Sequence, residues 1–257
     1  MSAPVFVVDH DQVSAVAAGG TVRLAGDEGR HASVVQRLTV GEEVELVDGQ
    51  GTRARCVIMA VGKGWLDCRV DELVQEPPEP IRVTLVQALA KSDRSEFAIQ
   101  AATELGVMAV VPWQAQRSIV QWRGDRAAKS HEKWQQAVLA ASKQARRAWH
   151  PQVQPLVTTT SLTESIVQAC QAQDTVLVLH ESATTGLSET VAPAGDPGEE
   201  RRVWLVVGPE GGISDDELHR FTQAGAKAVR LGPHVLRTST AGPAAIAALQ
   251  MLWGGWK

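Results

Sequence analysis

The first part of the chain consists of short segments with the residue pattern of strands. Asp48-Gly49 is a strong hairpin signal because glycine tolerates positive φ, and Gly62–Gly64 predicts the next turn. Asp27–Leu38 looks helical, with Asp27 as its expected cap. Several short strands with one helix favour a small β-barrel. The expected strands are Thr21–Leu24, Glu43–Val47, Arg53–Val61 and Trp65–Val70.

Beyond the proline-rich segment at residues 76–80, strands and helices alternate. Proline lacks a backbone N–H and stiffens the chain, so this segment predicts a linker between domains of residues 1–75 and 81–257. The alternation predicts an α/β domain with a mostly parallel sheet covered on both faces. Ser182–Arg202, rich in Gly, Pro, Ser and Glu, is an expected surface loop. The expected strands are Val83–Ala88, Met108–Val111, Thr175–Leu179, Val203–Val207 and Ala228–Leu231, and the expected helices are Ser95–Leu105, Trp134–Trp149, Ser214–Ala224 and Thr240–Trp253.

Composition narrows the class of protein. Hydrophobic residues make up 44% of the 257, enough for a core, but no apolar run reaches the roughly 18 residues of a membrane span. The N-terminus lacks the basic start and apolar stretch of a signal peptide, so we expect a soluble cytoplasmic protein. Cys56, Cys68 and Cys170 fit neither a disulfide framework nor a metal pair. We expect them to be buried free thiols, and we expect no metal.

Charge is unevenly distributed along the chain. The formal net charge is −4, which by itself argues against a general nucleic-acid binder. Residues 82–150, however, contain 11 of the 25 Lys and Arg and only 5 of the 29 Asp and Glu. A basic middle in an acidic protein suits one directed anionic surface. A solvated helix face is an equally good explanation from charge alone.

The most informative stretch is Val203–Glu217, where a buried-type strand leads into the loop Gly208–Gly212 and then into a helix. Ser214 and Glu217 have the spacing of a capping box. The loop therefore lies after a strand and before a helix N-terminus, where open α/β sheets bind ligands. Neither glycine-rich phosphate-loop motif occurs in the chain. A purely structural turn is the alternative.

A second stretch, Val229–Pro243, has the same order of strand, glycine-containing loop and helix, with Pro243 in the expected first turn. Two such loops could form opposite walls of one pocket. At least one hydroxyl of Thr238, Ser239 and Thr240 is expected to cap the helix. Arg237 is less easily explained by structure, since an arginine on an apolar loop usually meets a carboxylate, a phosphate or an aromatic face.

Together, Gly208–Ser214 and Leu231–Ala241 resemble the SPOUT class of RNA methyltransferases, and within it the 16S ribosomal RNA (uracil-N3)-methyltransferase family. The resemblance extends over nearly the whole chain. Gln87–Leu105 and Trp134–Pro151 also match, and Gly29–Leu38 and Gly41–Gly51 resemble the N-terminal PUA-like β-barrel of that family. His234 and Ser239 depart from it, standing where arginine and glutamate are common.

The resemblance implies a C-terminal trefoil-knot domain, a homodimer, and S-adenosyl-L-methionine (AdoMet) bound between the knot loops. The product would be N3-methyluridine in 16S rRNA of the small ribosomal subunit. The positions that match the cofactor site are Leu179, His180, Glu181, Gly208, Pro209, Glu210, Gly211, Gly212, Leu231, Gly232, Leu236, Arg237, Thr238, Thr240 and Ala241.

Two residues are candidates for catalysis. Methyl transfer to uracil N3 requires loss of the N3 proton or stabilisation of the uracil anion. We expect Arg237 to donate to a uracil carbonyl and to spread the developing negative charge. Glu210 is a candidate for accepting the proton or for holding Arg237, with a loop-shaping hydrogen bond as the alternative.

The expected RNA contacts form a basic set on both domains, although a solvated charge is the simpler explanation for any one member. One rival function is ribose 2′-O-methylation by the same fold. Another is a non-catalytic RNA-binding or ribosome-assembly factor. The basic set comprises Arg23, Arg30, His31, Arg37, Lys91, Arg94, Arg117, Arg123, Lys143, Arg146 and Arg147.

Overall fold

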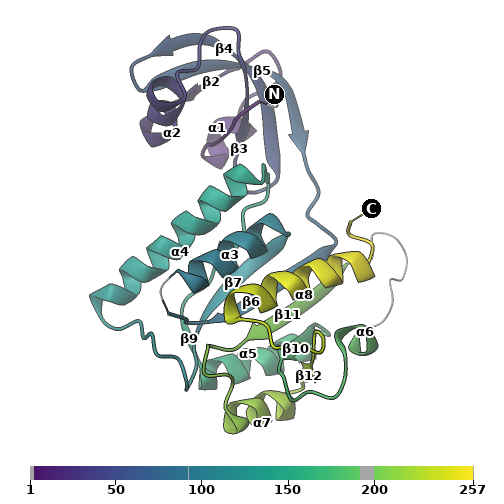
Figure 1. Cartoon of the computed structure of the whole chain (residues 1–257). Coiled ribbons are helices and arrows are strands. Elements are labelled where there is room, and N and C mark those ends of the chain that lie inside the picture. The colour runs from purple at the N-terminus through teal and green to yellow at the C-terminus, as the bar shows by residue number, and fades with distance from the viewer. Residues whose placement is uncertain (1–2, 92, 192–199, 257) are drawn as a thin grey trace. The chain divides into compact units, whose positions relative to one another are not determined.

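The computed structural model describes residues 3–91, 93–191 and 200–256. Contacts divide the chain into two compact units. The N-terminal unit contains Met1–Pro78 and Ser142–His150, and the C-terminal unit contains Glu79–Ala141 and Pro151–Lys257. Figure 1 labels the elements of both units.

The N-terminal unit is built on a five-stranded sheet with the order β1-β3-β4-β5-β2. β1 is parallel to β3, and the other neighbours are antiparallel. Side chains alternate between a buried and an exposed face, and the buried face forms a core with Phe6, Leu46 and Ile58 fully enclosed. The strands are β1 Val5–Val7, β2 Thr21–Leu24, β3 Glu43–Val47, β4 Thr52–Gly62 and β5 Trp65–Gln75.

The expected helix at residues 27–38 is shorter and less regular than its pattern suggests. After the short helix α1 (His10–Ser14), the chain forms α2 (Gly26–Arg30), which continues into a π-helical turn at His31–Val35. The N-cap of α2 is Ala25 and not Asp27, so the predicted cap is wrong. Arg37, with φ at 56°, is in the left-handed region and ends the helical segment.

A second correction concerns the expected helix at residues 134–149. Helix α4 extends from Asp125 to Gln144, and Arg146 takes a positive φ of 56°. The chain then pairs with the β3–β4 turn, since Gly51 N–H donates to Ala148 O (3.0 Å) and His150 N–H donates to Gly49 O (3.0 Å). The contacts therefore group Ser142–His150 with the N-terminal unit, whereas the sequence division places this segment in the second domain.

The C-terminal unit is an α/β structure around a parallel sheet with the order β12-β10-β11-β6-β7-β8, and β9 also pairs with β7. Each predicted strand coincides with an observed one, because long buried apolar runs are the typical pattern of parallel strands. The strands are β6 Ile81–Ala88, β7 Val107–Gln114, β8 Gln152–Val153, β9 Val157–Thr158, β10 Thr175–Leu179, β11 Arg201–Val207 and β12 Lys227–Val229.

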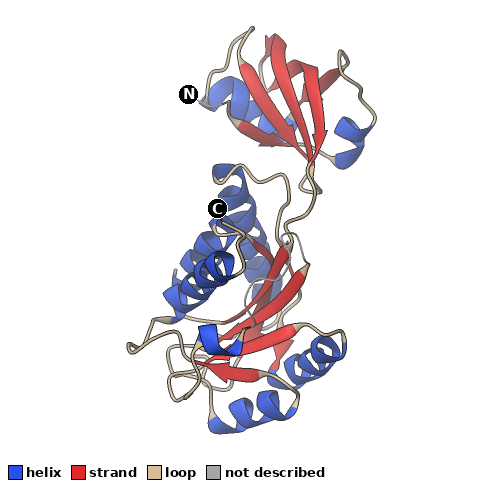
Figure 2. Cartoon of the chain, turned by 90° about the vertical axis from the view of Figure 1, so that its right-hand side faces the viewer, coloured by secondary structure: helices blue, strands red, loops and turns tan. Residues whose placement is uncertain are grey.

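Helices cover both faces of this sheet, as Figure 2 shows. On one face, Ile99 of α3 and Ile246 of α8 join Leu85 of β6 in one core. On the other, Ile166 of α5 and Phe221 of α7 join a core that contains β6 residue Val86. β6 is therefore buried on both sides from Leu85 onward, which explains why the consecutive residues Leu85 and Val86 are both apolar. The helices are α3 Arg94–Glu104, α5 Thr159–Gln171, α7 Asp215–Gln223 and α8 Thr238–Leu252.

Part of the expected loop at residues 182–202 is ordered structure. It contains the short helix α6 (Leu187–Thr190), and β11 begins at Arg201, while residues 192–199 lie outside the described part of the chain. The loop also pairs with the segment that follows β12: Arg230 N–H donates to Thr185 O (3.0 Å) and Leu187 N–H donates to Arg230 O (3.1 Å). The segment after β12 thus lies alongside the β10–α6 connection before it leads into α8.

Among the residues that the structure describes there is neither a membrane-spanning helix nor a disulfide. None of their helices is both long enough and apolar enough to cross a bilayer. The thiols are free: Cys56 and Cys68 are buried as expected, whereas Cys170 is partly exposed. Burial raises the pKa of Cys56 to about 12 and that of Cys68 to about 11, so neither is a ready nucleophile.

Candidate active site

The candidate site lies where β10, β11 and β12 end. These three strands are parallel neighbours, so their carboxyl ends meet at one edge of the sheet. Leu179 ends β10, Val207 ends β11 and Val229 ends β12. The two glycine-containing loops therefore leave β11 and β12, which flank β10, at the same edge of the sheet, as opposite walls of a pocket require.

The first loop, residues 208–214, is a tight turn with its own internal bonds. Gly212 N–H donates to Pro209 O (2.9 Å), and Gly212 has a positive φ of 73°. A Cβ on Gly208 would lie 2.7 Å from Ile213 Cγ1, so this glycine is required by packing within the loop. The predicted capping box is confirmed: Glu217 N–H donates to Ser214 Oγ (3.3 Å), and Ser214 N–H donates to Glu217 Oε2 (3.1 Å).

The second loop, residues 230–237, leads into α8 two residues earlier than expected. Arg237 is the N-cap, its side chain makes no capping bond, and Pro243 lies inside the helix rather than in its first turn. The expectation of hydroxyl capping is therefore wrong here. Thr240 Oγ1 instead donates to Arg237 O (3.2 Å), and Thr238 Oγ1 donates to Gly208 O (2.6 Å).

A buried glutamine joins the two loops, and sequence reasoning missed it. Gln87, fully buried at the end of β6, donates through Nε2 to Thr238 Oγ1 (2.9 Å) and to Ala88 O (3.3 Å). Because Thr238 in turn donates to Gly208 O, the amide, the hydroxyl and the carbonyl form one directed chain. A polar residue at the end of an otherwise apolar strand was the available signal.

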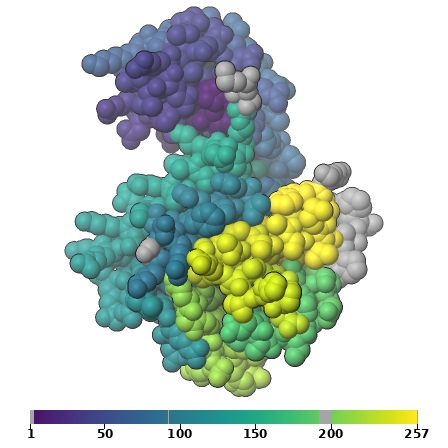
Figure 3. Space-filling view, in the orientation of Figure 1, coloured from purple at the N-terminus to yellow at the C-terminus, as the bar shows by residue number. Residues whose placement is uncertain are grey.

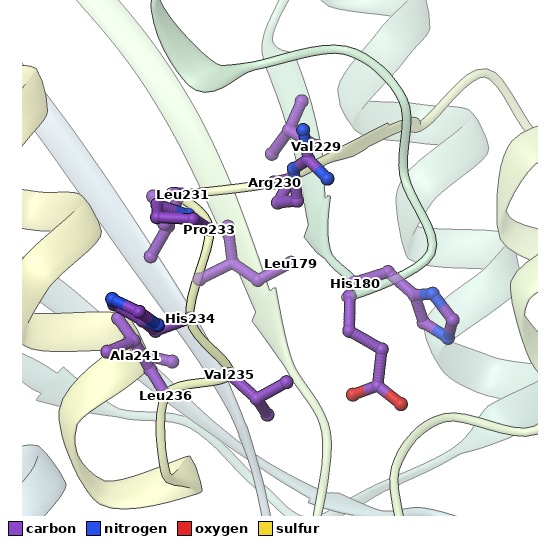
Figure 4. A pocket seen from close by; sticks show the side chains of 12 residues that line it. Leu179, His180, Val229, Arg230, Leu231, Pro233, His234, Val235, Leu236 and Ala241 are labelled. Carbon is purple, nitrogen blue, oxygen red and sulfur yellow. The ribbon is translucent and has the colours of Figure 1, made fainter.

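An apolar pocket lies between the second loop and the end of β10. Figure 4 shows Leu179 with the Leu231–Leu236 segment on one side and His180 on the other. Seven of the predicted cofactor positions line it. Sequence reasoning did not select the remaining five. The predicted seven are Leu179, His180, Glu181, Leu231, Gly232, Leu236 and Ala241, and the other five are Val229, Arg230, Pro233, His234 and Val235.

A second, more polar pocket adjoins the first and shares four lining residues with it, namely His180, Glu181, Val235 and Leu236. Arg237 and Thr238 line it from the start of α8. It also brings in two arginines from the predicted RNA-binding set: Arg94, the first residue of α3, and Arg117, which lies in the loop after β7. The rest of its lining is Pro209, Glu210, Gly211, Gly212, Ile213 and Asp215.

Glu210 contacts Arg94, not the Arg237 that the sequence suggested. Its Oε1 accepts from the Arg94 guanidinium (2.9 Å) and from the Lys91 backbone N–H (3.0 Å). Partial burial raises the pKa of Glu210, but these bonds and one from its own backbone N–H outweigh it and lower the pKa below its usual value. A carboxylate with a lowered pKa is a weak proton acceptor, so the geometry favours the loop-shaping alternative.

The remaining predicted residues line neither pocket, and some of them already form ion pairs with other side chains. Gly208 and Thr240 line neither pocket. In the N-terminal unit, Arg23 stacks on Trp65 and pairs with Asp67 (2.7 Å), and Lys143 pairs with Glu28 (2.6 Å). The other predicted RNA contacts of that unit are Arg30, His31 and Arg37, which are exposed, and Arg146 and Arg147, which are partly buried; Lys91 and Arg123 of the C-terminal unit are exposed.

Among the residues that the structure places, no three His, Cys, Asp or Glu side chains gather as metal ligands would. The site consists of a pocket with an apolar wall bounded by loop backbone, next to a polar pocket lined by three arginines and three carboxylates. Such a pair of pockets can hold a flat, partly apolar ligand beside an anionic one.

Two models of known protein families match the chain, one in each part of it. A family model described as RNA methyltransferase domain matches residues 77–250, and one described as RNA methyltransferase PUA domain matches residues 24–71. The predicted fold class, an N-terminal PUA-like domain with a C-terminal α/β domain of the SPOUT type, is confirmed.

Relatives and solved structures extend over nearly all of the chain. Ribosomal RNA small subunit methyltransferase E of Mycobacterium tuberculosis is 45% identical across 93% of this chain and 89% of its own, and that of Bacillus subtilis is 31% identical across 89% of each. The crystal structure of the Neisseria gonorrhoeae enzyme bound to S-adenosyl methionine is 31% identical and covers 98% of both chains, with a TM-score of 0.85. A Legionella pneumophila methyltransferase in complex with the same cofactor is 27% identical and covers 98% of both, with a TM-score of 0.83. With this identity over almost its whole length, the chain belongs to the ribosomal RNA small subunit methyltransferase E family.

Proposed function

We propose that this protein transfers the methyl group of AdoMet to N3 of a uridine in 16S rRNA. The observation that carries the proposal is the pair of adjoining pockets with a shared wall at Val235 and Leu236. One pocket suits the cofactor, and the other suits a nucleotide that carries negative charge. A shared wall brings the two ligands close enough for direct transfer.

The apolar pocket fits the adenosine part of AdoMet. Leu179, Leu231 and Leu236 can enclose a flat ring, and the backbone of the second loop and of the end of β10 can bond its polar edge. Relatives crystallised with S-adenosyl methionine support this assignment. When bound, the cofactor supplies an electrophilic methyl group on a positively charged sulfur.

Arg237 has the position expected of a group that stabilises negative charge on the base. It lines the polar pocket next to Leu236, which lines both pockets. It is exposed, and it precedes a helix whose first residue, Thr238, is fixed by two hydrogen bonds. A guanidinium near a uracil carbonyl favours loss of the N3 proton because it stabilises the anion that results. We assign Arg237 this role, and Glu210 the support of the loop.

The remainder of the RNA would be held by the basic residues of both units. We retain the division into a PUA-like RNA-binding domain at residues 1–75, a linker at residues 76–80 and a catalytic domain from residue 81. Ser142–His150 is an exception, because its contacts are with the N-terminal unit. Arg23, Arg30, His31 and Arg37 are the exposed members of the basic set at residues 1–75, and Arg23 is already paired with Asp67.

The protein would act as a homodimer in the cytoplasm. Apolar side chains are exposed around the C-terminal helix: Met251 is 65% exposed, and Val235, beside the pockets, is 74% exposed. Figure 3 shows α8, in yellow, at the surface of the face in view. Apolar side chains gathered on one surface are typical of an interface between subunits.

The decisive experiment is methyl transfer from radiolabelled AdoMet to small ribosomal subunits and to naked 16S rRNA, followed by nucleoside mass spectrometry. N3-methyluridine is the expected product. A 2′-O-methylated nucleoside would overturn the choice of acceptor atom. Binding of AdoMet without any transfer would favour a non-catalytic RNA-binding protein.

A further inference from the structure

The loop at residues 208–212 holds two arginines, Arg94 and Arg117. We propose that Arg117, with Arg94 as a second donor, forms a subsite for a backbone phosphate of the RNA next to the methyl-transfer site. This inference rests on the proposed function and identifies which group of the substrate the polar pocket binds.

Arg117 is held against the glycines of the loop. Its guanidinium Nη1 donates to Gly211 O (3.2 Å). A Cβ on Gly211 would lie 3.1 Å from Arg117 Cβ, tighter than ordinary van der Waals contact, so a side chain there would push Arg117 away. Glycine at position 211 therefore lets Arg117 pack closely against the loop.

Arg94 is held by the neighbouring residue of the same loop. Its Nη1 donates to Glu210 Oε1 (2.9 Å), and the same oxygen accepts from Lys91 N–H (3.0 Å), which fixes the carboxylate. The side chain of Arg94 is 44% exposed, so donors remain free to meet a ligand. Consecutive residues of one loop thus orient both guanidinium groups before any ligand arrives.

Their partners differ, and this difference points to Arg117 as the principal anion site. The charge of Arg94 is balanced by Glu210, whereas the described partner of Arg117 is a neutral carbonyl. Glu181 and Asp215 also line the pocket, so it is not uniformly positive, and an anion must be placed by a specific cation. A guanidinium with fixed orientation and unused N–H donors matches the geometry of a phosphodiester.

The test compares the full-length wild-type protein with Arg117→Gln, Arg117→Lys and a matched control. Lys129→Gln removes one positive charge from the exposed surface of α4, outside both pockets. Three quantities are measured for each: kcat and KM with small ribosomal subunits, the salt dependence of 16S rRNA binding, and AdoMet affinity by calorimetry.

For Arg117→Gln we expect KM for RNA to rise about tenfold, and the slope of log affinity against log salt to fall by about one. AdoMet affinity should stay within about twofold. Arg117→Lys should keep the salt slope but lose part of the affinity for RNA, because lysine keeps the positive charge but lacks the paired N–H donors of a guanidinium. Lys129→Gln should change KM little.

Unchanged KM and salt slope in Arg117→Gln would overturn the subsite. A loss confined to AdoMet affinity would also overturn it, since the anion bound would then be the cofactor's carboxylate. If the wild-type protein transferred no methyl group to RNA, the proposed function would fail. The salt slope of RNA binding would still decide the role of Arg117.

Discussion

At the scale of single residues, the candidate site combines exposed cations with a few buried polar groups that set the loops. Arg237 faces the pocket, whereas Gln87 and Thr238 are buried beneath it and join β6 to both loops. Glu217, almost fully buried, likewise accepts from Gln116 N–H (2.7 Å) and Thr159 Oγ1 (2.8 Å), and so ties α7 to two neighbouring segments. Reactivity and loop geometry are therefore separable by mutation.

Arg237→Ala should lower kcat by about 10² to 10³, because removing one donor aimed at developing charge has effects of this size. AdoMet affinity should change much less, since the apolar pocket and the backbone remain. Single-turnover methylation and calorimetric titration with AdoMet measure the two effects separately. Comparable losses in turnover and in cofactor affinity would contradict the role of Arg237 in stabilising the base.

Thr238→Val should lower the free energy of unfolding by about 1–3 kcal/mol, because the buried Gln87 amide and Gly208 carbonyl would lose their partner. Thr238→Ser keeps the hydroxyl and should recover most of this loss. Urea denaturation of the three proteins provides the comparison. An unchanged stability in Thr238→Val, or a larger loss in Thr238→Ser than in Thr238→Val, would contradict the role of the hydrogen-bond chain.

At the scale of elements, the turn between β3 and β4 packs against the segment that follows α4. Gly51, with φ at 99°, faces the ring of Trp149, whose Nε1 donates to Glu76 O (3.0 Å). A Cβ on Gly51 would lie 2.6 Å from that ring. Next to it, burial and the charge of Arg147 lower the pKa of His150, which favours its neutral form. The turn, the tryptophan and the histidine thus form one packed element.

Gly51→Ala tests this packing against Gly41→Ala. Gly41 also has a positive φ, 92°, but a Cβ there would meet nothing within 4 Å. Both substitutions should lose about 1–2 kcal/mol from backbone strain. Gly51→Ala should lose about 1–3 kcal/mol more from overpacking against Trp149. Chemical denaturation followed by tryptophan fluorescence measures the difference, and equal stabilities would refute the packed element.

At the scale of the whole molecule, the chain exposes apolar side chains beside the site. Met251 and Leu252 end α8, and Val235 and Leu236 lie in the loop that walls both pockets. If a second copy covers this surface, the pockets would be completed next to the subunit interface. Cofactor binding and association would then be coupled.

Met251→Glu should shift the protein toward monomer, because a carboxylate buried at an interface is strongly unfavourable. Val40→Glu, at a 61% exposed position of the N-terminal unit, is the control and should leave the association unchanged. Sedimentation equilibrium over a range of concentrations gives both dissociation constants. A wild-type protein that is monomeric at micromolar concentration would overturn the proposed homodimer.

The sequence by itself determined the features that depend on neighbouring residues. The apolar runs of β6, β10 and β11 predicted the parallel strands, and the spacing of Ser214 and Glu217 predicted the capping box. Such features are decided by local periodicity and by hydrogen bonds between residues a few positions apart. Helix ends were less well predicted, as at Gln144 and Ala25, because tertiary pairing competes with helical propensity.

Only the tertiary structure decided which polar groups meet. Glu210 and Arg94 are 116 positions apart, and Gln87 and Thr238 are 151 positions apart. No periodicity connects residues so distant, because their approach depends on strand order and on the path of the chain after β12. The sequence therefore located the loops that bind ligands, whereas the fold selected Arg94 for Glu210, Gly211 for Arg117 and Thr238 for Gln87.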